Sequence, residues 1–279
     1  MSHYSLSHLK GSTIVVKFGG AAMEVDEVKD LIADQLAVLH SHGAKVVVVH
    51  GAGHEIGRWV SKLQLPAPQF IAGCRVTDSD TMVITEMVLG GLVNGDLTSR
   101  ISARGVPALG VSGRSAQLTT ATVKKGPKGE QLGRVGELAA VNTDRISKLL
   151  TEGYMLVMPC YSQDETRAPL NINGDHFAAS LAGAIRAEWC IFLTNVPGVM
   201  QNGTVIPTLE VGKALTLIES GVVSGGMIPK VESACKACGE GAQLSVIADA
   251  AERDILLTLL SRTSEPSENK VGTIFSGTS

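Results

Sequence analysis

Runs of apolar, mostly β-branched residues alternate with segments of helical periodicity along most of the chain. The clearest pair is the apolar run 13–18 followed by the segment 25–42, in which Leu31, Leu36 and Leu39 share one helical face. Gly43 is then a typical helix stop. The pattern predicts strands at 13–18, 45–50, 108–111, 154–158, 189–193 and 243–247, and helices at 25–42, 55–63, 81–103, 175–187 and 231–239.

Strands that are apolar throughout and alternate with helices indicate a mostly parallel sheet that is covered on both faces. The predicted fold is therefore an α/β, three-layer αβα sandwich. We expect an N-terminal lobe, 1–187, and a C-terminal lobe, 188–279, that share one continuous sheet. The polar stretch 124–131 is expected to be an exposed hairpin connection, and 261–270 a solvated loop. The aromatic residues expected in the core are Trp59, Phe70, Trp189, Phe192 and Phe275.

Composition and charge exclude several classes of function. The 279 residues carry a formal net charge of −3, which gives no basic footprint for nucleic acid or an anionic membrane. No apolar run approaches the roughly 20 residues that span a bilayer. Five cysteines, an odd number, and an N-terminus without an apolar signal core favour reduced thiols in a cytoplasmic protein.

Two glycine-containing turns follow predicted strands. Lys17 stands at the end of the first strand and is followed by Gly19 and Gly20, while Gly51, Ala52 and Gly53 lead from the second strand into a helix. Backbone N–H groups, a helix N-terminus and an ammonium group together suit a polyphosphate or a carboxylate. A plain turn or packing role is equally open for either turn taken alone.

Two common nucleotide motifs are absent. No segment has the P-loop pattern Gly-x-x-x-x-Gly-Lys-Ser/Thr. The dinucleotide fingerprint fails because Ile56 fills its third glycine position and because 65–74 holds no acid for a ribose. These absences exclude the simplest dehydrogenase.

Two further segments combine charged or amide side chains with helix starts. Pro229 fits the first turn of a helix, but Lys230 beside it faces the positive end of the helix dipole. Such a lysine either points into solvent or has an anion nearby. Asn171, Asn173 and Asp175 lead into the apolar helix that runs to 187, where Asp175 suits the N-cap or the first turn. The alternating amides suit binding of a polar small molecule.

Other pairs of potential ligands favour structural roles. Cys235 and Cys238 have redox spacing, but no second pair exists, so two thiols on one helix face are the better interpretation. His50 and His54 are four apart, but His50 ends a strand, so a shared metal is not expected. We expect no metal bound directly by side chains.

The two glycine turns, the segment 171–175 and the helix start at Lys230 follow one another in an order that resembles the amino-acid kinase family. The resemblance covers nearly the whole chain, from about 13 to 273. The segments 72–78, 86–91, 110–113, 193–199 and 272–273 add to the resemblance. It implies ATP-dependent phosphorylation of the side-chain carboxylate of N-acetylglutamate to an acyl phosphate, as in arginine biosynthesis. It also implies Mg²⁺ bound through the nucleotide phosphates.

The resemblance further implies roles for individual residues. Lys17 and Lys230 would stabilise the transferring phosphoryl group, and Asp175 would hold both lysines. Arg75 would pair with the α-carboxylate of the substrate, a two-point contact that suits guanidinium. The implied substrate-binding residues are Gly20, Ala52, Gly53, Arg75, Asn171 and Asn173, and the implied nucleotide-binding residues are Asn195, Val196, Gly198, Val199, Met200, Val222 and Ser224.

The chemistry agrees with this assignment. Phosphoryl transfer needs positioning and charge neutralisation, which lysines, amide N–H groups and a metal supply. A carboxylate nucleophile is already ionised at pH 7, so no general base is required.

Departures from the family pattern leave alternatives open. Ala52 stands where relatives usually have glycine, Asn195 replaces an aspartate, and 114–116 and 247–252 also differ. Ala52 either has a positive φ, with a strained methyl near the reacting carboxylate, or has a negative φ and packs normally. The chain could act on another acylated or carbamoylated amino acid, or be a ligand-binding regulatory homologue. A short N-terminal extension favours a homodimer that lacks control by arginine.

Overall fold

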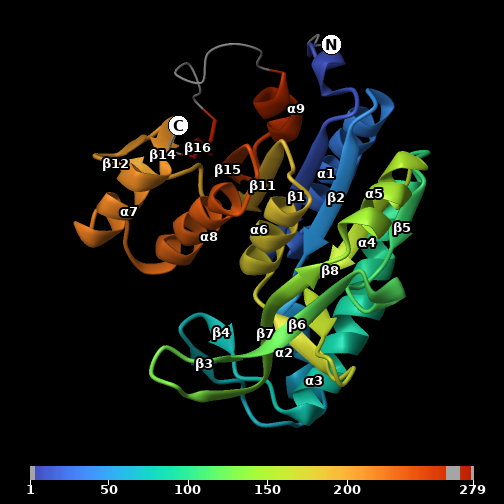
Figure 1. Cartoon of the computed structure of the whole chain (residues 1–279), viewed down its shortest axis with the longest axis vertical. Coiled ribbons are helices and arrows are strands. Elements are labelled where there is room, and N and C mark those ends of the chain that lie inside the picture. The colour runs from blue at the N-terminus through green and yellow to red at the C-terminus, as the bar shows by residue number, and fades with distance from the viewer. Residues whose placement is uncertain (1–3, 262–270, 278–279) are drawn as a thin grey trace.

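The computed structural model describes residues 4–261 and 271–277, so the predicted loop at 261–270 lies outside the described residues apart from Ser261. Within them, eight strands form one sheet in the order β14-β16-β15-β11-β1-β2-β8-β5 (Figure 1). Every neighbouring pair is parallel except β15 and β16. The strands are β1 Thr13–Phe18, β2 Lys45–His50, β5 Ala108–Gly110, β8 Met155–Pro159, β11 Trp189–Thr194, β14 Thr208–Glu210, β15 Leu244–Asp249 and β16 Thr273–Ser276. The six predicted strands are confirmed.

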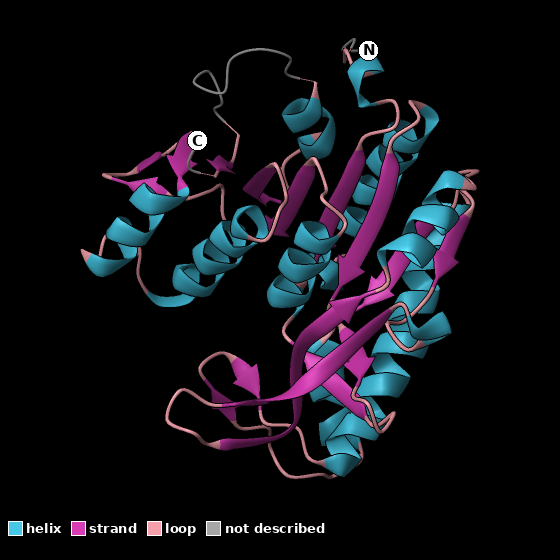
Figure 2. Ribbon diagram, viewed as in Figure 1, coloured by secondary structure: helices cyan, strands magenta, loops and turns pink. Residues whose placement is uncertain are grey.

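Helices cover both faces of this sheet, which confirms the three-layer sandwich (Figure 2). Successive side chains of β1 point to opposite faces: Ile14 and Val16 join the core under α1, α4 and α9, whereas Val15 joins the core under α5, α6 and α8. In the described part of the chain, no helix combines the length and apolar character needed to cross a membrane. The helices are α1 Asp26–Ser41, α2 Gly53–Lys62, α3 Ser79–Glu86, α4 Asn94–Ser102, α5 Thr143–Thr151, α6 Gly174–Ala184, α7 Val211–Glu219, α8 Ile228–Gly239 and α9 Ile255–Leu260.

The predicted helix 81–103 is a continuous helical segment with an unusual middle. Its central part, Met87–Val93, is π-helical and joins α3 to α4. Gly90 lies in this part, and a Cβ built on it would lie 2.5 Å from the hydroxyl oxygen of Tyr161. A side chain at position 90 would therefore require Tyr161 to move where the helix meets the strand after β8.

A second sheet, in the order β6-β7-β10-β9, was not predicted. Its strands β6 and β7 are antiparallel and flank 124–131, which confirms the hairpin connection expected there. Short pairs of strands form two further hairpins, β3–β4 and β12–β13. The remaining strands are β3 Phe70–Ile71, β4 Cys74–Arg75, β6 Thr119–Lys125, β7 Gln131–Val141, β9 Tyr161–Gln163, β10 Pro169–Ile172, β12 Met200–Gln201 and β13 Thr204–Val205.

Four of the five aromatic residues expected in the core pack there. Phe192 and Phe275 are fully buried, and Trp59 and Trp189 are partly buried against the two cores. The prediction for Phe70 is wrong, because 60% of it is exposed on the hairpin β3–β4. A two-residue strand at the edge of the molecule has no second layer of side chains to cover it.

Backbone contacts fix the chain just after Arg75 to strand β7. The N–H of Thr77 donates to the carbonyl of Leu132 at 3.0 Å, and the N–H of Arg134 donates to the carbonyl of Thr77 at 2.6 Å. Between them, Gly133 has φ +70°, and a Cβ on it would lie 2.2 Å from the Thr77 oxygen. The close approach that positions Arg75 therefore depends on a glycine.

We predict that Gly133→Ala lowers the free energy of unfolding by about 2–4 kcal/mol, since both the backbone conformation and the contact oppose a methyl group. Gly129→Ala is the matched control, because Gly129 has φ +83° with no atom within 4 Å of its Cβ position. It should lose only about 1 kcal/mol. Equal losses in chemical denaturation would show that the contact with Thr77 is unimportant.

Candidate active site

Two lysines from distant segments meet at one carboxylate. Lys17 is in β1, Asp175 is in the first turn of α6, and Lys230 is in the first turn of α8. Lys17 Nζ lies 2.7 Å from Asp175 Oδ1, and Lys230 Nζ lies 3.9 Å from Asp175 Oδ2. The three side chains are 11%, 14% and 23% exposed. Of the two possibilities for Lys230, the structure thus shows the one with an anion nearby, which is Asp175, and the three predicted catalytic residues lie together.

The start of α6 explains why Asp175 is free to bind the lysines. Asn173 is the N-cap, and its Oδ1 accepts hydrogen bonds from the N–H groups of Asp175 at 2.9 Å and His176 at 3.2 Å. Asp175 is accordingly a first-turn acid and not the cap. Its carboxylate is favoured there by the helix dipole and turns toward β1 and α8.

Burial and the neighbouring charges have opposing effects on the pKa values of Asp175 and Lys230. Burial alone raises the pKa of Asp175, but Lys17 and Lys230 outweigh it, so the pKa lies below its ordinary value. Burial, with a contribution from Lys17, lowers the pKa of Lys230 against the opposing effect of Asp175. One carboxylate between two ammonium groups leaves net positive charge available to an incoming anion.

Glycines surround the Lys17 ammonium group. A Cβ on Gly19 would lie 3.2 Å from Lys17 Nζ and 3.5 Å from the backbone nitrogen of Gly51. A Cβ on Gly174 would lie 3.4 Å from Lys17 Cε. Because these positions carry no side chain, backbone N–H groups and the ammonium group can face the same small volume.

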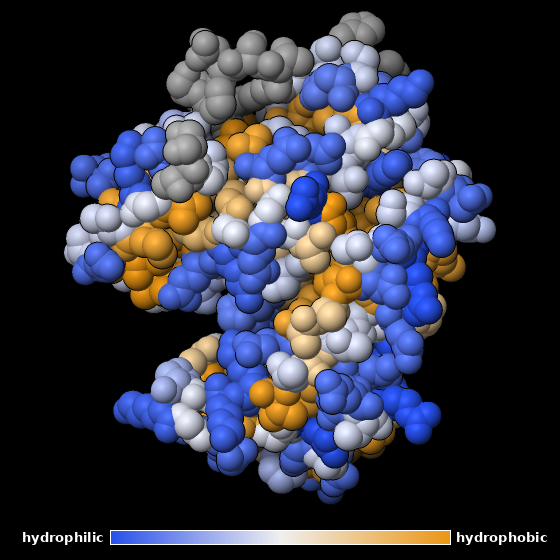
Figure 3. Space-filling model, in the orientation of Figure 1, coloured by the Kyte–Doolittle hydropathy of each residue, from blue (hydrophilic) through white to orange (hydrophobic). Residues whose placement is uncertain are grey.

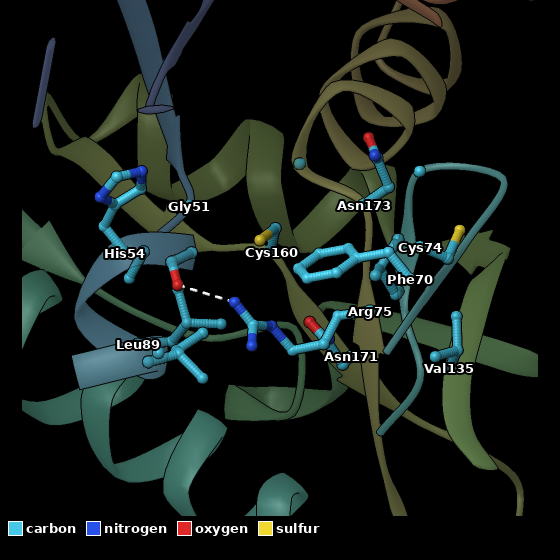
Figure 4. Close-up of a pocket in the computed structure, with 17 residues that line it drawn as sticks. Gly51, His54, Phe70, Cys74, Arg75, Leu89, Val135, Cys160, Asn171 and Asn173 are labelled. Atoms are coloured by element: carbon cyan, nitrogen blue, oxygen red, sulfur yellow. Dashed lines mark hydrogen bonds between the residues drawn. The ribbon is translucent and has the colours of Figure 1, made fainter. Parts of the chain in front are cut away.

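A cavity of about 540 Å³ opens beside this group (Figure 4). Its walls come from the turn 51–53 at the start of α2, from the β3–β4 hairpin, and from β10 with the start of α6. Figure 3 shows the molecule hollowed between the part with β3 and β4 and the part with α7 and α8. The predicted substrate-binding residues that line the cavity are Ala52, Gly53, Arg75, Asn171 and Asn173.

Arg75 has an unsatisfied donor in this cavity. Its Nη2 donates to the carbonyl of Gly53 at 2.8 Å, and the guanidinium lies over the Phe70 ring at 4.9 Å from the centroid (Figure 4). Its Nη1 is buried and has no hydrogen-bond partner among the residues that the structure describes. Burial lowers the pKa of Arg75 from its ordinary value. A bound anion would satisfy this donor.

The two predicted amides have different roles. Asn171 Nδ2 donates to Thr77 Oγ1 at 3.2 Å, and Thr77 Oγ1 donates to the carbonyl of Arg75 at 2.8 Å. This leaves Asn171 Oδ1 as an acceptor. Asn173 also lines the cavity, but its oxygen caps α6, and Figure 4 shows its side chain pointing toward that helix.

The structure shows one of the two alternatives left open for Ala52 and places Gly20 outside the Arg75 cavity. Ala52 has φ −155°, so the hypothesis of a strained, left-handed Ala52 is wrong, and its methyl packs with the core. Gly20 has φ +72° and does not line the Arg75 cavity. It lines a neighbouring cavity of about 700 Å³ that shares the turn 51–53 with the first.

The residues assigned to the nucleotide follow β11 or precede α8. Val199 is buried, and its N–H donates to Thr273 Oγ1 at 2.8 Å, so its side chain belongs to the core. Gly198 has φ +146°, and a Cβ on it would lie 2.7 Å from the same hydroxyl oxygen. Met200 and Val222 expose 40% and 42% of their surface. Asn195 and Ser224 are also exposed, and Val196 is half-buried.

The cysteine and histidine pairs lie apart from this chemistry. Burial raises the pKa of Cys235 to about 11, and Cys238 Sγ contacts Ser245 Oγ at 3.4 Å. His50 is fully buried, whereas His54 is mostly exposed and pairs with Glu24 at 2.8 Å. Nowhere in the described ranges do three His, Cys, Asp or Glu side chains gather as metal ligands.

Comparison with known proteins decides the family. A sequence profile described as the amino acid kinase family matches residues 12–249. The chain belongs to the amino acid kinase family. It is 38% identical to acetylglutamate kinase of Gloeobacter violaceus over 257 residues, which cover 90% of this chain and 84% of that one. It is 39% identical to the chloroplastic acetylglutamate kinase of Arabidopsis thaliana, with 90% and 73% covered.

Solved structures of lower identity share the amino acid kinase fold. N-acetylglutamate synthase from Neisseria gonorrhoeae matches with a TM-score of 0.81 and 24% identity, and covers 98% of this chain. The chain spans only 63% of the length of that synthase. Carbamate kinase from Giardia matches with a TM-score of 0.67 and 17% identity, with 95% of this chain and 99% of that one covered.

Several residues that build the site were not predicted from the sequence. Thr77 orients Asn171, and Phe70 stacks on Arg75. Cys160 lines the cavity near Lys17, and burial raises the pKa of its thiol to about 12, against an opposing effect of Lys17. Thr77 lay within a family-like run, but nothing in the sequence pointed to Phe70 or Cys160.

Proposed function

We propose that this chain transfers the γ-phosphoryl group of ATP to the side-chain carboxylate of N-acetylglutamate. One observation carries the proposal: Lys17 and Lys230 share the buried carboxylate of Asp175 beside a cavity in which Arg75 holds an unsatisfied donor. The relatives named acetylglutamate kinase, at 38–39% identity over about 90% of the chain, support the same activity.

The cavity supplies complementary groups for an acylated acidic amino acid. Arg75 Nη1 would pair with the α-carboxylate, which is its missing acceptor. Asn171 Oδ1, whose amide nitrogen is already bound to Thr77, would accept the N–H of the acylated amine. The side-chain carboxylate would then extend toward the turn 51–53 and Lys17.

Transfer requires no proton removal from the nucleophile. The carboxylate oxygen of the acid attacks the γ-phosphorus of ATP, the bond between that phosphorus and the leaving oxygen of ADP breaks, and an acyl phosphate forms. Lys17 and Lys230 neutralise charge on the phosphoryl oxygens, while Asp175 keeps both ammonium groups in place. Backbone N–H groups of the turn 51–53 add donors beside Lys17.

We place the nucleotide in the C-terminal lobe, 188–279, and the amino acid in the N-terminal lobe, 1–187. The exposed side chains of Met200 and Val222 would contact the adenine of ATP. Lys230, at the start of α8, would reach the phosphates of ATP. Mg²⁺ bound to the phosphates would neutralise charge as they react. The nucleotide residues are the seven predicted ones: Asn195, Val196, Gly198, Val199, Met200, Val222 and Ser224.

Two alternatives make different predictions for the same assay. A family member with another acylated or carbamoylated substrate would consume ATP with a different acid, and a ligand-binding homologue would consume none. ATP consumption should therefore be measured with N-acetylglutamate, N-acetylaspartate, free glutamate and carbamate. We expect turnover with N-acetylglutamate in clear preference to the others. Turnover with another acid, or with none, would overturn the proposal.

We predict that Arg75→Lys raises the KM for the acid about tenfold or more and leaves the KM for ATP within about twofold, because one ammonium cannot keep the bond to the Gly53 carbonyl and pair with the carboxylate in the geometry of the guanidinium. Steady-state kinetics with each substrate varied in turn measures both constants. Arg58→Lys is the control, since Arg58 is an exposed arginine paired with Glu55 outside this cavity. An increase confined to the KM for ATP would place Arg75 on the nucleotide side.

We also propose a homodimer that forms through the helical segment α3–α4. Val83, Met87 and Leu92 are 58%, 63% and 48% exposed. A spacing of four residues in α3 and of five in the π-helical part keeps them on one face. This apolar stripe, defined by the three residues, would be covered by its counterpart in a second copy.

We predict that Met87→Glu shifts the protein from dimer to monomer in sedimentation velocity, since it places a charge in the apolar contact. Val123→Glu, at a residue 51% exposed in β6, should leave the dimer intact. A monomeric wild-type protein, or a dimeric Met87→Glu variant, would contradict this interface.

A further inference from the structure

A buried histidine stands directly before the turn 51–53 and contacts it. His50 is the last residue of β2 and is 0% exposed. Its Nδ1 lies 3.4 Å from the carbonyl oxygen of Gly51, and its Nε2 lies 3.0 Å from Asn94 Nδ2. The proposed mechanism assigns no role to this ring.

Asn94 in α4 determines which ring nitrogen of His50 carries the proton. Asn94 Nδ2 also lies 2.9 Å from the carbonyl oxygen of Val157. A carbonyl only accepts, so the amide group facing it must be the NH₂. Its second hydrogen then points to Nε2 of His50, which must accept. The neutral ring therefore carries its hydrogen on Nδ1, and burial lowers the pKa of His50 to about 4, which keeps the ring neutral at pH 7.

A glycine makes room for this arrangement. Gly110 ends β5, and a Cβ on it would lie 2.2 Å from Asn94 Oδ1. The amide oxygen thus packs against the bare backbone of β5 while the amide nitrogen reaches β8 and His50. Strands β5, β8 and β2 and helix α4 together fix the histidine.

The tautomer has a consequence for the turn. Nδ1–H of His50 donates to the carbonyl of Gly51. In a trans peptide the carbonyl and the following N–H point in opposite directions. The N–H of Ala52 is consequently turned away from His50. In the described part of the chain, the N–H groups of Ala52 and Gly53 donate to no acceptor.

The same turn lies against the reacting centre. A Cβ on Gly19 would lie within 3.5 Å of both Lys17 Nζ and the nitrogen of Gly51. The carbonyl of His50 accepts from the N–H of Cys160 at 3.1 Å, so the residue before the turn is held as well. The peptide that carries the Ala52 N–H therefore directly follows a backbone nitrogen, that of Gly51, which lies near the Lys17 ammonium group.

We propose that His50 is a positioning residue: its Nδ1–H holds the Gly51–Ala52 peptide so that the Ala52 N–H points at the oxygen between the acid and the transferring phosphoryl group. The inference rests on the proposed function and deepens it. His50 touches neither substrate and transfers no proton. Its contribution is the orientation of one donor before the reaction begins.

Two variants test the hydrogen bonds of the two His50 ring nitrogens separately. In His50→Asn the amide nitrogen can replace Nδ1 and keep the bond to Gly51, whereas in His50→Gln the amide oxygen can replace Nε2 and keep only the bond to Asn94. We expect His50→Gln to lower kcat about tenfold or more, since small misplacements of reacting groups are costly. We expect His50→Asn to stay within about threefold of the wild type. The KM for ATP should change less than twofold in both.

Thermal unfolding of both variants controls for stability, since each loses one buried hydrogen bond. Nitrogen-15 shifts of the imidazole, assigned by comparison with His50→Gln, should report a hydrogen on Nδ1 between pH 6 and 8. A hydrogen on Nε2, or equal kcat in both variants at equal stability, would overturn the role of His50. An inactive wild type would instead overturn the proposed function itself.

Discussion

The rest of this structure depends on one buried carboxylate that bridges two ammonium groups. Asp175 could not remain ionised among apolar neighbours without a charged partner. Lys17 at 2.7 Å and Lys230 at 3.9 Å supply two, and their combined effect on its pKa exceeds that of burial. The ends of β1, α6 and α8 must therefore converge. The order of the large sheet allows this, because β1 lies between β11 and β2 near its centre.

Much of the remaining site consists of backbone made accessible by small residues. Gly19 and Gly174 leave room beside the Lys17 side chain, and Gly133 lets the chain after Arg75 pass against β7. Buried polar side chains then set the direction of the exposed groups: Thr77 orients Asn171, and His50 contacts the carbonyl of Gly51. A few side chains supply the charge of the site, while the packed backbone and buried hydrogen bonds hold its groups in position.

Six of the eight strands of the large sheet could be predicted, chiefly from runs that are apolar along their length, as 13–18 and 45–50 show. The short strands β14 and β16 were not predicted. The small sheet could not be predicted, because β9 and β10 are only three and four residues long and β6 loses its alternation after Ala121. Lys17, Asp175 and Lys230 stood out as charged groups at strand or helix ends. The capping role of Asn173 and the exposure of Phe70 depend on tertiary contacts that no local pattern records. Ala52 lies outside the left-handed region that favours glycine, so its departure from the family pattern involves no left-handed backbone.

The central claim is that Lys17 and Lys230 act as one unit on the transferring phosphoryl group. A double-mutant cycle in kcat with Lys17→Met, Lys230→Met and the double variant tests it most directly. Lys29→Met, at a lysine paired with Asp26 and Asp96 on the other face of the sheet, serves as the control. We predict that each single variant loses about 10²–10³ in kcat, and that the double variant loses far less than the product. A kcat within about threefold of the wild type in either single variant would contradict the account, since removing one preorganised donor is expected to cost far more.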